Sequence, residues 1–277
     1  MGAQEFDSII DAALREDMPG GDITSESVVP ADARSEAFFM AKEDGVLAGL
    51  AVARRVFEKV DPSIIFIERF SEGAAFRKTD KLARLKGPTI SLLKGERTAL
   101  NFLQHLCGVA TATRRFVDAV AGFKTHILDT RKTTPGLRLL EKYAVKTGGG
   151  TNHRLSLSDM VLIKDNHLRH VGSVAEAVRR ARSRIRPGVR VEVEAADLLQ
   201  VREALAAGAD MIMLDNMTIE MMRQAVILAA SRVPLEASGN MSLDRVHAVA
   251  ETGVDYISVG ALTHSAPAID ISLDFLY

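Results

Sequence analysis

Apolar residues recur at helical spacing near the start of the chain, over residues 5–17, and the segment MPGGD follows them. This pattern predicts an amphipathic helix that ends at the Pro-Gly pair. From Val28 to Gly87, short apolar pieces are separated by Asp-Gly, Glu-Gly and Gly-Pro, which is typical of strands joined by turns. Residues 47–60 interrupt them with a helical pattern, and residues 89–121 predict one or two further helices. The first part of the chain is therefore predicted to be α+β.

After Gly122 the pattern changes to short, nearly continuous apolar runs at roughly regular intervals. Six such runs are predicted strands: THILD, MVLIK, RVEVEA, DMIMLD, VPLEASG and DYISVG. Helical segments over 173–185, 197–208 and 218–230 separate several of them. Strands that alternate with helices in this way indicate parallel βαβ units covered on both faces.

Most of these six strands end in charged or glycine-bearing positions, as expected where the carboxyl ends of barrel strands form a site. We therefore predict an α/β protein, with an N-terminal α+β domain followed by an incomplete, six-stranded α/β barrel. The predicted boundaries are 1–110 for the first domain and 111–265 for the barrel. Residues 266–277 are expected to pack back on the N-terminal domain.

Composition narrows the class of protein. The 277 residues are 47% hydrophobic and carry a net charge of −1, so a large core is expected and no global field attracts nucleic acid or a membrane. Cys107 is the single cysteine, which excludes an intrachain disulfide and favours a buried core residue. No signal peptide is recognised at the N-terminus, and no apolar run approaches the roughly 20 residues of a membrane span. We expect a cytoplasmic protein.

Cations gather around the ends of the first two barrel strands, beginning with the adjacent pair in LDTRKTTPGLR. They are Arg131, Lys132, Arg138, His153, Arg154 and Lys164. Each alone could be a solvated surface residue. Together they predict a pocket for a small, multiply charged anion, because arginine binds carboxylates through paired hydrogen bonds and lysine acts as a point charge.

Acids follow on the next strands. Glu194 and Asp215 end neighbouring strands, and Glu236 follows in the one after. Carboxylates beside an anion pocket suit Mg²⁺, which binds through one or two of them and bridges substrate phosphates. The residues alone leave this open, since the same acids could be strand-end caps or partners of the lysines.

Glycines mark the ends of the last two strands, in ASGNMSLDR and SVGALTHS. In barrels of this kind these two loops often bind a phosphate through backbone N–H groups. The residues thus predict a site with three parts, for a compact polyanion, a metal and a phosphate.

Several longer strings resemble the quinolinate phosphoribosyltransferase family over nearly the whole chain. They include KGERTALNFLQHLCGVAT, ILDTRKTTPGLR, EKYAVKTGGGTNHRLSLSDMVLIKDNH, EASGN and ISVGALTHS. The resemblance implies a pentosyltransferase of NAD synthesis that joins quinolinate to phosphoribosyl pyrophosphate, with magnesium. The implied products are nicotinate mononucleotide, pyrophosphate and carbon dioxide. It also implies a homodimer, or a hexamer of dimers, with shared active sites.

The resemblance assigns roles residue by residue. Quinolinate binding is implied for Arg97, Arg131, Lys132, His153, Arg154 and Lys164. Catalysis is implied for Lys132, Glu194 and Asp215, the last two also near magnesium, and phosphoribosyl binding for Ser238, Gly239, Asn240, Gly260 and Ala261. Arg97 is implied to reach the neighbouring subunit's pocket. Leu100, Phe102 and Leu103 beside it could then bury apolar area in a dimer interface. Asn240 departs from the family's usual glycine but tolerates positive φ.

Two other functions stay open. One is a related phosphoribosyltransferase, such as the molybdenum-operon relatives, that acts on nicotinate or another small anion. A pocket with four cations would be excessive for nicotinate, which has one carboxylate. The other is a non-catalytic phosphosugar-binding barrel, which would have no reason to keep Glu194 and Asp215 beside the pyridine-acid pocket.

Overall fold

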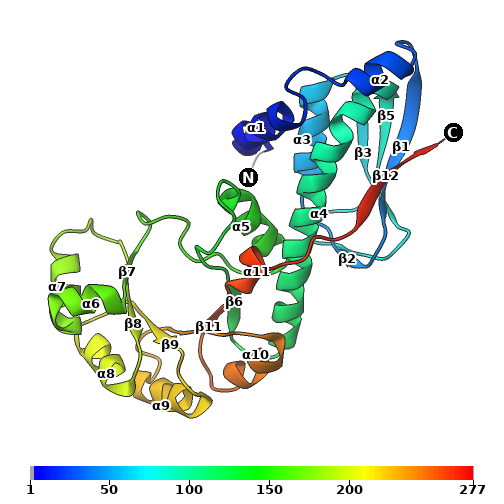
Figure 1. The fold of residues 1–277 in the computed structure, drawn as a ribbon. Coiled ribbons are helices and arrows are strands. Elements are labelled where there is room, and N and C mark those ends of the chain that lie inside the picture. The colour runs from blue at the N-terminus through cyan, green and yellow to red at the C-terminus, as the bar shows by residue number, and fades with distance from the viewer. Residues whose placement is uncertain (1–2, 277) are drawn as a thin grey trace. The chain divides into compact units, whose positions relative to one another are not determined.

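The chain folds into two compact units, here called the N-terminal unit and the barrel unit (Figure 1). The structure, a computed structural model, describes residues 3–276. The N-terminal unit contains the described residues up to Arg114, the segment Thr134–Gly149 and the described residues from Ser265 onward. The barrel unit contains Arg115–Thr133 and Gly150–His264.

An antiparallel sheet forms the centre of the N-terminal unit. Its strand order is β12 (Ile271–Leu276), β1 (Arg34–Ala41), β5 (Lys81–Pro88) and β3 (Ile65–Glu68). The last strand of the chain thus pairs with the first. Two short strands, β2 (Gly45–Val46) and β4 (Ala75–Phe76), form a separate pair.

Helices complete this unit, which confirms the predicted α+β class. They are η1 (Ala3–Phe6), α1 (Asp7–Asp17), α2 (Ile23–Val28), α3 (Leu50–Val60), α4 (Thr89–Ala119) and α5 (Arg138–Thr147). Helix α4 is a single helix of 31 residues that continues into the barrel unit. Leu100, Phe102 and Leu103 on α4 are 2%, 8% and 0% exposed within the chain itself. These side chains are already covered within the chain and leave little apolar area for a dimer interface, which stays a prediction.

The barrel unit contains six parallel strands. In spatial order they are β6 (His126–Leu128), β11 (Tyr256–Ser258), β10 (Leu235–Ser238), β9 (Met211–Asp215), β8 (Val191–Ala195) and β7 (Val161–Ile163). Within residues 3–276 no strand ladder joins β6 to β7, so the barrel is open there. This confirms the incomplete six-stranded barrel.

Short helices follow the strands of this unit. They are α6 (Asp165–Val171), α7 (Val174–Arg182), α8 (Leu198–Ala206), α9 (Ile219–Ala229), α10 (Leu243–Ala250) and α11 (Ala261–His264). Ser173, Asp197 and Thr218 cap α7, α8 and α9, each accepting a backbone N–H with its side-chain oxygen. None of the helices in the described part of the chain has the length and apolar character needed to cross a bilayer.

Candidate active site

Polar side chains occur at alternate positions of the central barrel strands. Glu194 on β8 lies beside Met213 on β9, and Met213 lies beside Glu236 on β10. Two residues further along, Asp215 lies beside Ser238. Because side chains of a strand alternate between its two faces, these residues project from the same face of the sheet. The carboxyl ends of the strands thus bring together groups that are far apart in the sequence.

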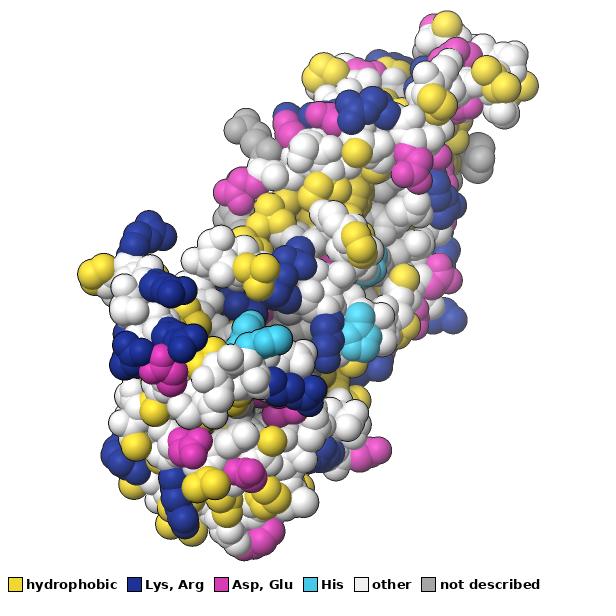
Figure 2. All heavy atoms as spheres, turned by 60° about the vertical axis from the view of Figure 1, so that its left-hand side comes forward, with side chains coloured by type: hydrophobic (Ala, Val, Ile, Leu, Met, Phe, Trp, Pro, Cys, Tyr) yellow, Lys and Arg dark blue, Asp and Glu magenta, His cyan; other side chains and the backbone are white. Residues whose placement is uncertain are grey.

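A cleft of about 420 Å³ opens over this face, a size typical of small-molecule sites. It is built entirely from residues of the barrel unit. Among the residues that line it are Asp129, Arg131, Lys132, His153, Arg154, Lys164, Glu194, Asp215, Glu236, Ser238 and Ser258. On the face of this unit seen in Figure 2, Lys, Arg and His side chains gather with acidic side chains between them.

The backbone of Lys132 is fixed at the rim of the cleft. Its N–H donates to Thr130 Oγ1 (3.0 Å), and its carbonyl accepts from Thr263 Oγ1 on α11 (2.8 Å). A Cβ atom added to Gly260 would lie 3.1 Å from Lys132 Cδ and 3.2 Å from His264 Nε2. The turn after β11 therefore packs against Lys132. The absence of a side chain at Gly260 leaves room for the Lys132 side chain.

Arg154 lies close to Arg131, although both are cations. Burial lowers the pKa of Arg154, and repulsion from Arg131 lowers it further. The negative charge of Glu192 acts in the opposite direction. Arg154 Nη1 also donates to the Met160 carbonyl oxygen (3.2 Å). Two arginines held together in this way form a site for an anion that can accept from both.

Two acids, Glu194 and Asp215, line the same cleft as these arginines. Lys164 Nζ is 3.1 Å from Glu194 Oε2, and the side chains are 46% and 13% exposed. Asp215 Oδ2 accepts a hydrogen bond from Asn216 Nδ2 (3.1 Å). A carboxylate pair on adjoining strands offers enough oxygen ligands for a magnesium ion that completes its shell with substrate phosphates and water.

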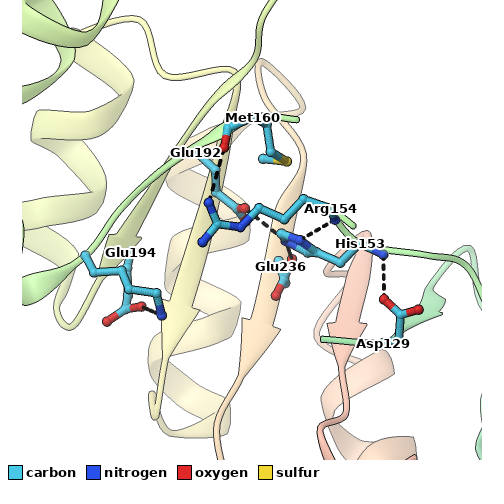
Figure 3. A network of polar contacts seen from close by, with 8 residues as sticks. Asp129, His153, Arg154, Met160, Glu192, Glu194 and Glu236 are labelled. Atoms are coloured by element: carbon cyan, nitrogen blue, oxygen red, sulfur yellow. Dashed lines mark hydrogen bonds and ion pairs between the residues drawn. The ribbon is translucent and has the colours of Figure 1, made fainter. Parts of the chain in front are cut away.

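A buried cluster underlies the cleft (Figure 3). His153 Nε2 lies 3.0 Å from Glu192 Oε2 and 3.2 Å from Glu236 Oε2, and both glutamates are fully buried. One nitrogen of His153 and one carboxylate oxygen of each glutamate lie within 4.8 Å of one another. Burial raises the pKa of Glu192 to about 7. The cluster thus keeps two acidic groups out of water close to the cationic residues.

The hydrogen bonds of His153 settle which ring nitrogen carries the hydrogen. Burial lowers the pKa of His153, but the contacts with Glu192 and Glu236 outweigh this effect and raise it to about 9. The backbone N–H of Arg154 opposes that rise, because it donates to Nδ1 (2.8 Å) and so requires a lone pair there. The neutral ring with its hydrogen on Nε2 satisfies both nitrogens.

The loop after β10 turns through two consecutive residues with positive φ. Gly239 and Asn240 have φ of 98° and 48°. Arg245 of α10 donates to the carbonyls of Gly239 (3.1 Å) and Met217 (3.0 Å). Arg245 thereby ties this loop to the one after β9 and occupies two carbonyl oxygens. Of the predicted phosphoribosyl residues, Ser238 lines the cleft and Gly239 and Asn240 follow it. Gly260 lies in the turn between β11 and α11, and Ala261 begins α11.

Gly239→Ala is expected to weaken binding of the phosphorylated substrate that the sequence resemblance implies, raising its KM about 10-fold or more. An added Cβ would lie 2.1 Å from Asn216 Oδ1, so the two loops must separate. Steady-state kinetics should be compared with Gly188→Ala, which has a similar φ of 86° but no atom within 4 Å of the added Cβ. Both variants lose about 1–2 kcal/mol of stability from the left-handed backbone. An equal KM in the two variants would contradict a phosphate site at this loop.

The cleft brings together most of the residues predicted from the sequence. Arg131, Lys132, His153, Arg154, Lys164, Glu194, Asp215 and Ser238 all line it. Arg97 is exposed on α4 and belongs to the N-terminal unit, so its role stays a prediction. Sequence reasoning did not assign Ser258 or Met213 to the site, and it did not recognise Glu192 and Glu236 as a buried pair. The sequence feature that could have indicated this buried pair is an acid at an inward-facing position of an apolar strand, as in VEVEA and PLEAS.

Comparison with known proteins extends the likeness to the full chain. The family profile described as "Quinolinate phosphoribosyl transferase, C-terminal domain" matches residues 109–274, and the corresponding N-terminal domain matches residues 22–107. A probable carboxylating nicotinate-nucleotide pyrophosphorylase of Bacillus subtilis is 42% identical over 274 residues, covering 99% of this chain and 94% of the relative. A Synechocystis protein described in the same words is 44% identical over 95% of this chain and 90% of its own length.

Solved structures agree with this assignment. The crystal structure of NadC from Streptococcus pyogenes matches with a TM-score of 0.96 and 42% identity, covering 100% of this chain and 99% of that one. The nicotinate-nucleotide pyrophosphorylase of Francisella tularensis matches with a TM-score of 0.95 and 40% identity, covering 100% and 98%. The chain therefore belongs to the quinolinate phosphoribosyltransferase family.

Proposed function

We propose that the chain transfers phosphoribose from phosphoribosyl pyrophosphate to quinolinate, with release of pyrophosphate and carbon dioxide. The product is nicotinate mononucleotide, as de novo NAD synthesis requires. The observation that carries this proposal is the cleft itself. It combines a cationic side (Arg131, Lys132, Arg154) with acids on adjoining strands (Glu194, Asp215) in a member of this family. The cationic side suits two carboxylates, and the acids suit a ribose carbon that becomes positively charged.

The chemistry needs no general base for the nucleophile, because the quinolinate nitrogen already carries a lone pair. That lone pair forms the bond to ribose carbon 1 while the bond to pyrophosphate breaks, which leaves positive charge near the ribose ring. Glu194 and Asp215 can stabilise this charge through space. Magnesium, held by the same two carboxylates and by substrate oxygens, would stabilise the negative charge of the leaving pyrophosphate.

Decarboxylation follows from the new charge on the pyridine nitrogen. The bond from ring carbon 2 to its carboxylate breaks, the electron pair stays on carbon 2, and a proton replaces carbon dioxide. We assign Lys132 to catalysis as well as binding, because an ammonium group can stabilise negative charge that develops on the ring. His153 and Arg154 are assigned to the quinolinate side with Arg131 and Lys164.

Lys132→Ala and Arg131→Ala are each expected to weaken quinolinate binding about 10- to 100-fold. Each removes a charge-assisted hydrogen bond worth roughly 1.5–3 kcal/mol. Isothermal calorimetry should show this loss with an unchanged melting temperature. The exposed Arg184, on the same unit but away from the cleft, supplies the control Arg184→Ala. Wild-type affinity in both cleft variants would remove these residues from the quinolinate site.

One alternative stays within phosphoribosyl transfer. A relative that takes nicotinate would need to neutralise a single carboxylate, whereas this cleft presents four cations, counting Lys164. Mass spectrometry of reactions with phosphoribosyl pyrophosphate and each acid in turn separates these functions. The proposal expects nicotinate mononucleotide from quinolinate and little product from nicotinate. Product from nicotinate alone would favour the alternative, and binding without turnover would favour a non-catalytic barrel.

A further inference from the structure

Three fully buried carboxylates lie in or beside the wall of the cleft, where their charge should repel an anionic ligand. They belong to Asp129 at the end of β6, Glu192 on β8 and Glu236 on β10. Burying a charged group is costly unless hydrogen bonds or opposite charges compensate it. A protein has no energetic reason to place these acids here for packing alone. Their contacts show which part of the chain they hold.

All three acids contact the short segment that leads from β6 towards β7. Asp129 Oδ1 accepts the backbone N–H of His153 (2.8 Å), and Oδ2 accepts Asn152 Nδ2 (2.5 Å). Glu192 and Glu236 face His153 Nε2 from two strands that β9 separates. Figure 3 shows the imidazole lying between them. One histidine thus joins three strands of the barrel through their carboxylates.

The imidazole uses both of its nitrogens inside the protein. Nε2 donates to Glu192 Oε2 and lies 3.2 Å from Glu236 Oε2, and Nδ1 accepts the backbone N–H of Arg154. With this tautomer no ring N–H is directed at a ligand in the cleft. The resemblance implies that His153 belongs to the quinolinate side of the cleft, and these contacts give it a further task there. They fix the backbone position from which the Arg154 side chain enters the cleft.

We propose that Glu192 and Glu236 are positioning residues that act through His153 to hold Arg154 beside Arg131 before the dicarboxylate binds. The inference rests on the proposed function, because it assumes that these two arginines bind quinolinate. Two like charges separate unless something restrains them. The buried acids provide both the hydrogen-bond anchor and the opposite charge. The quinolinate site is then assembled in advance, and less binding energy is lost in ordering it.

The two possible roles of the acids, direct repulsion and positioning, predict opposite changes in quinolinate affinity when an acid is removed. If the acids acted only by charge, removing one would lessen repulsion and tighten quinolinate binding. If they position Arg154, removing one weakens binding even though the pocket becomes more positive. The relevant variants are Glu192→Ala and Glu236→Ala, which lose the acceptor, and Glu192→Gln, which keeps an acceptor oxygen but loses the charge. Glu203→Ala on the exposed surface of α8 is the matched control.

Calorimetric titration of each folded variant with quinolinate tests the proposal. Wild-type protein comes first, because failure of wild type to bind or convert quinolinate refutes the proposed function rather than this inference. With a functional wild type, the two alanine variants are expected to bind about 10-fold more weakly, the range of one lost hydrogen bond to a charged group. The KM for phosphoribosyl pyrophosphate should change less than about 2-fold, a split that general loss of structure would not produce.

The conservative variant and a double mutant complete the test. Glu192→Gln should bind within about 3-fold of wild type, and it decides the question if Glu192→Ala does not fold. The double variant with His153→Ala and Glu192→Ala should bind quinolinate no more weakly than the weaker-binding single variant, because both changes break the same chain of contacts. Unchanged or tighter quinolinate binding in a folded glutamate variant would overturn the proposal. Fully additive effects in the double mutant would overturn it as well.

Discussion

Asp215→Asn is expected to lower kcat about 100- to 1000-fold while quinolinate affinity stays within about 2-fold of wild type. Asp215 ends β9 and lies next to Ser238. Glu194 pairs with Met213, two positions before Asp215, and so projects from the same face of the sheet. Its charge matters most when the ribose carbon is positive, which occurs in the transition state and not in the bound substrate. Loss of one such preorganised group typically costs two to three orders of magnitude in rate.

The measurement combines steady-state kinetics with calorimetric titration of quinolinate. Asp118→Asn, at an exposed position of α4, is a matched control that should keep wild-type kinetics. The asparagine side chain is close in size to aspartate, so the fold should persist. If the Asp215 variant turned over normally and lost quinolinate affinity instead, the acid and cation sides of the cleft would have to be exchanged in the proposed mechanism.

Mixing two inactive variants is expected to restore up to about one quarter of wild-type activity. The variants are Arg97→Ala and Lys132→Ala. If Arg97 completes the pocket of a second copy, a mixed dimer contains one site with both lesions and one site with neither. Random exchange makes half of the dimers mixed, and one of two sites in each is intact. This gives one quarter if the sites act independently.

The structure supports a role for Arg97 only indirectly. Its side chain is exposed, and it lies on the one helix that runs through both units. Leu100, Phe102 and Leu103, which the sequence suggested could bury apolar area in a dimer interface, are buried in the chain itself. The case therefore rests on the arginine and on the family likeness. Subunit exchange should be verified by native mass spectrometry. Complete exchange without recovered activity would place Arg97 outside the partner's site.

Much of the fold followed from periodicity alone. The six barrel strands were predictable because parallel strands covered on both faces are short apolar runs, as in MVLIK and DMIMLD. Helix α5 was not predicted. Glu141 and Lys142 lie in its centre and are 0% and 3% exposed, so charged residues occupy its inner face. His105 and the backbone N–H of Thr134 satisfy Glu141. A pattern of apolar positions does not show a helix that buries charges in this way.

Many residues that line the cleft could be predicted from the sequence, but the contacts among them could not. Lys132, Glu194 and Asp215 were found because strand ends of a barrel meet at one face. The task of His153 could not be predicted, since it depends on Glu192 and Glu236, which are 39 and 83 residues away in the chain. A composition rule treats such acids as exposed, because isolated buried carboxylates are rare. Only the register of β8, β9 and β10 brings them to one histidine.

The central claim is that the cleft catalyses phosphoribosyl transfer coupled to decarboxylation. It is tested most directly with quinolinate that carries an isotopic label in its 2-carboxylate. In the presence of magnesium and phosphoribosyl pyrophosphate, labelled carbon dioxide and nicotinate mononucleotide should form in equal amounts. Omission of phosphoribosyl pyrophosphate should abolish both. Release of label without nicotinate mononucleotide, or formation of a nucleotide that retains the label, would contradict the account.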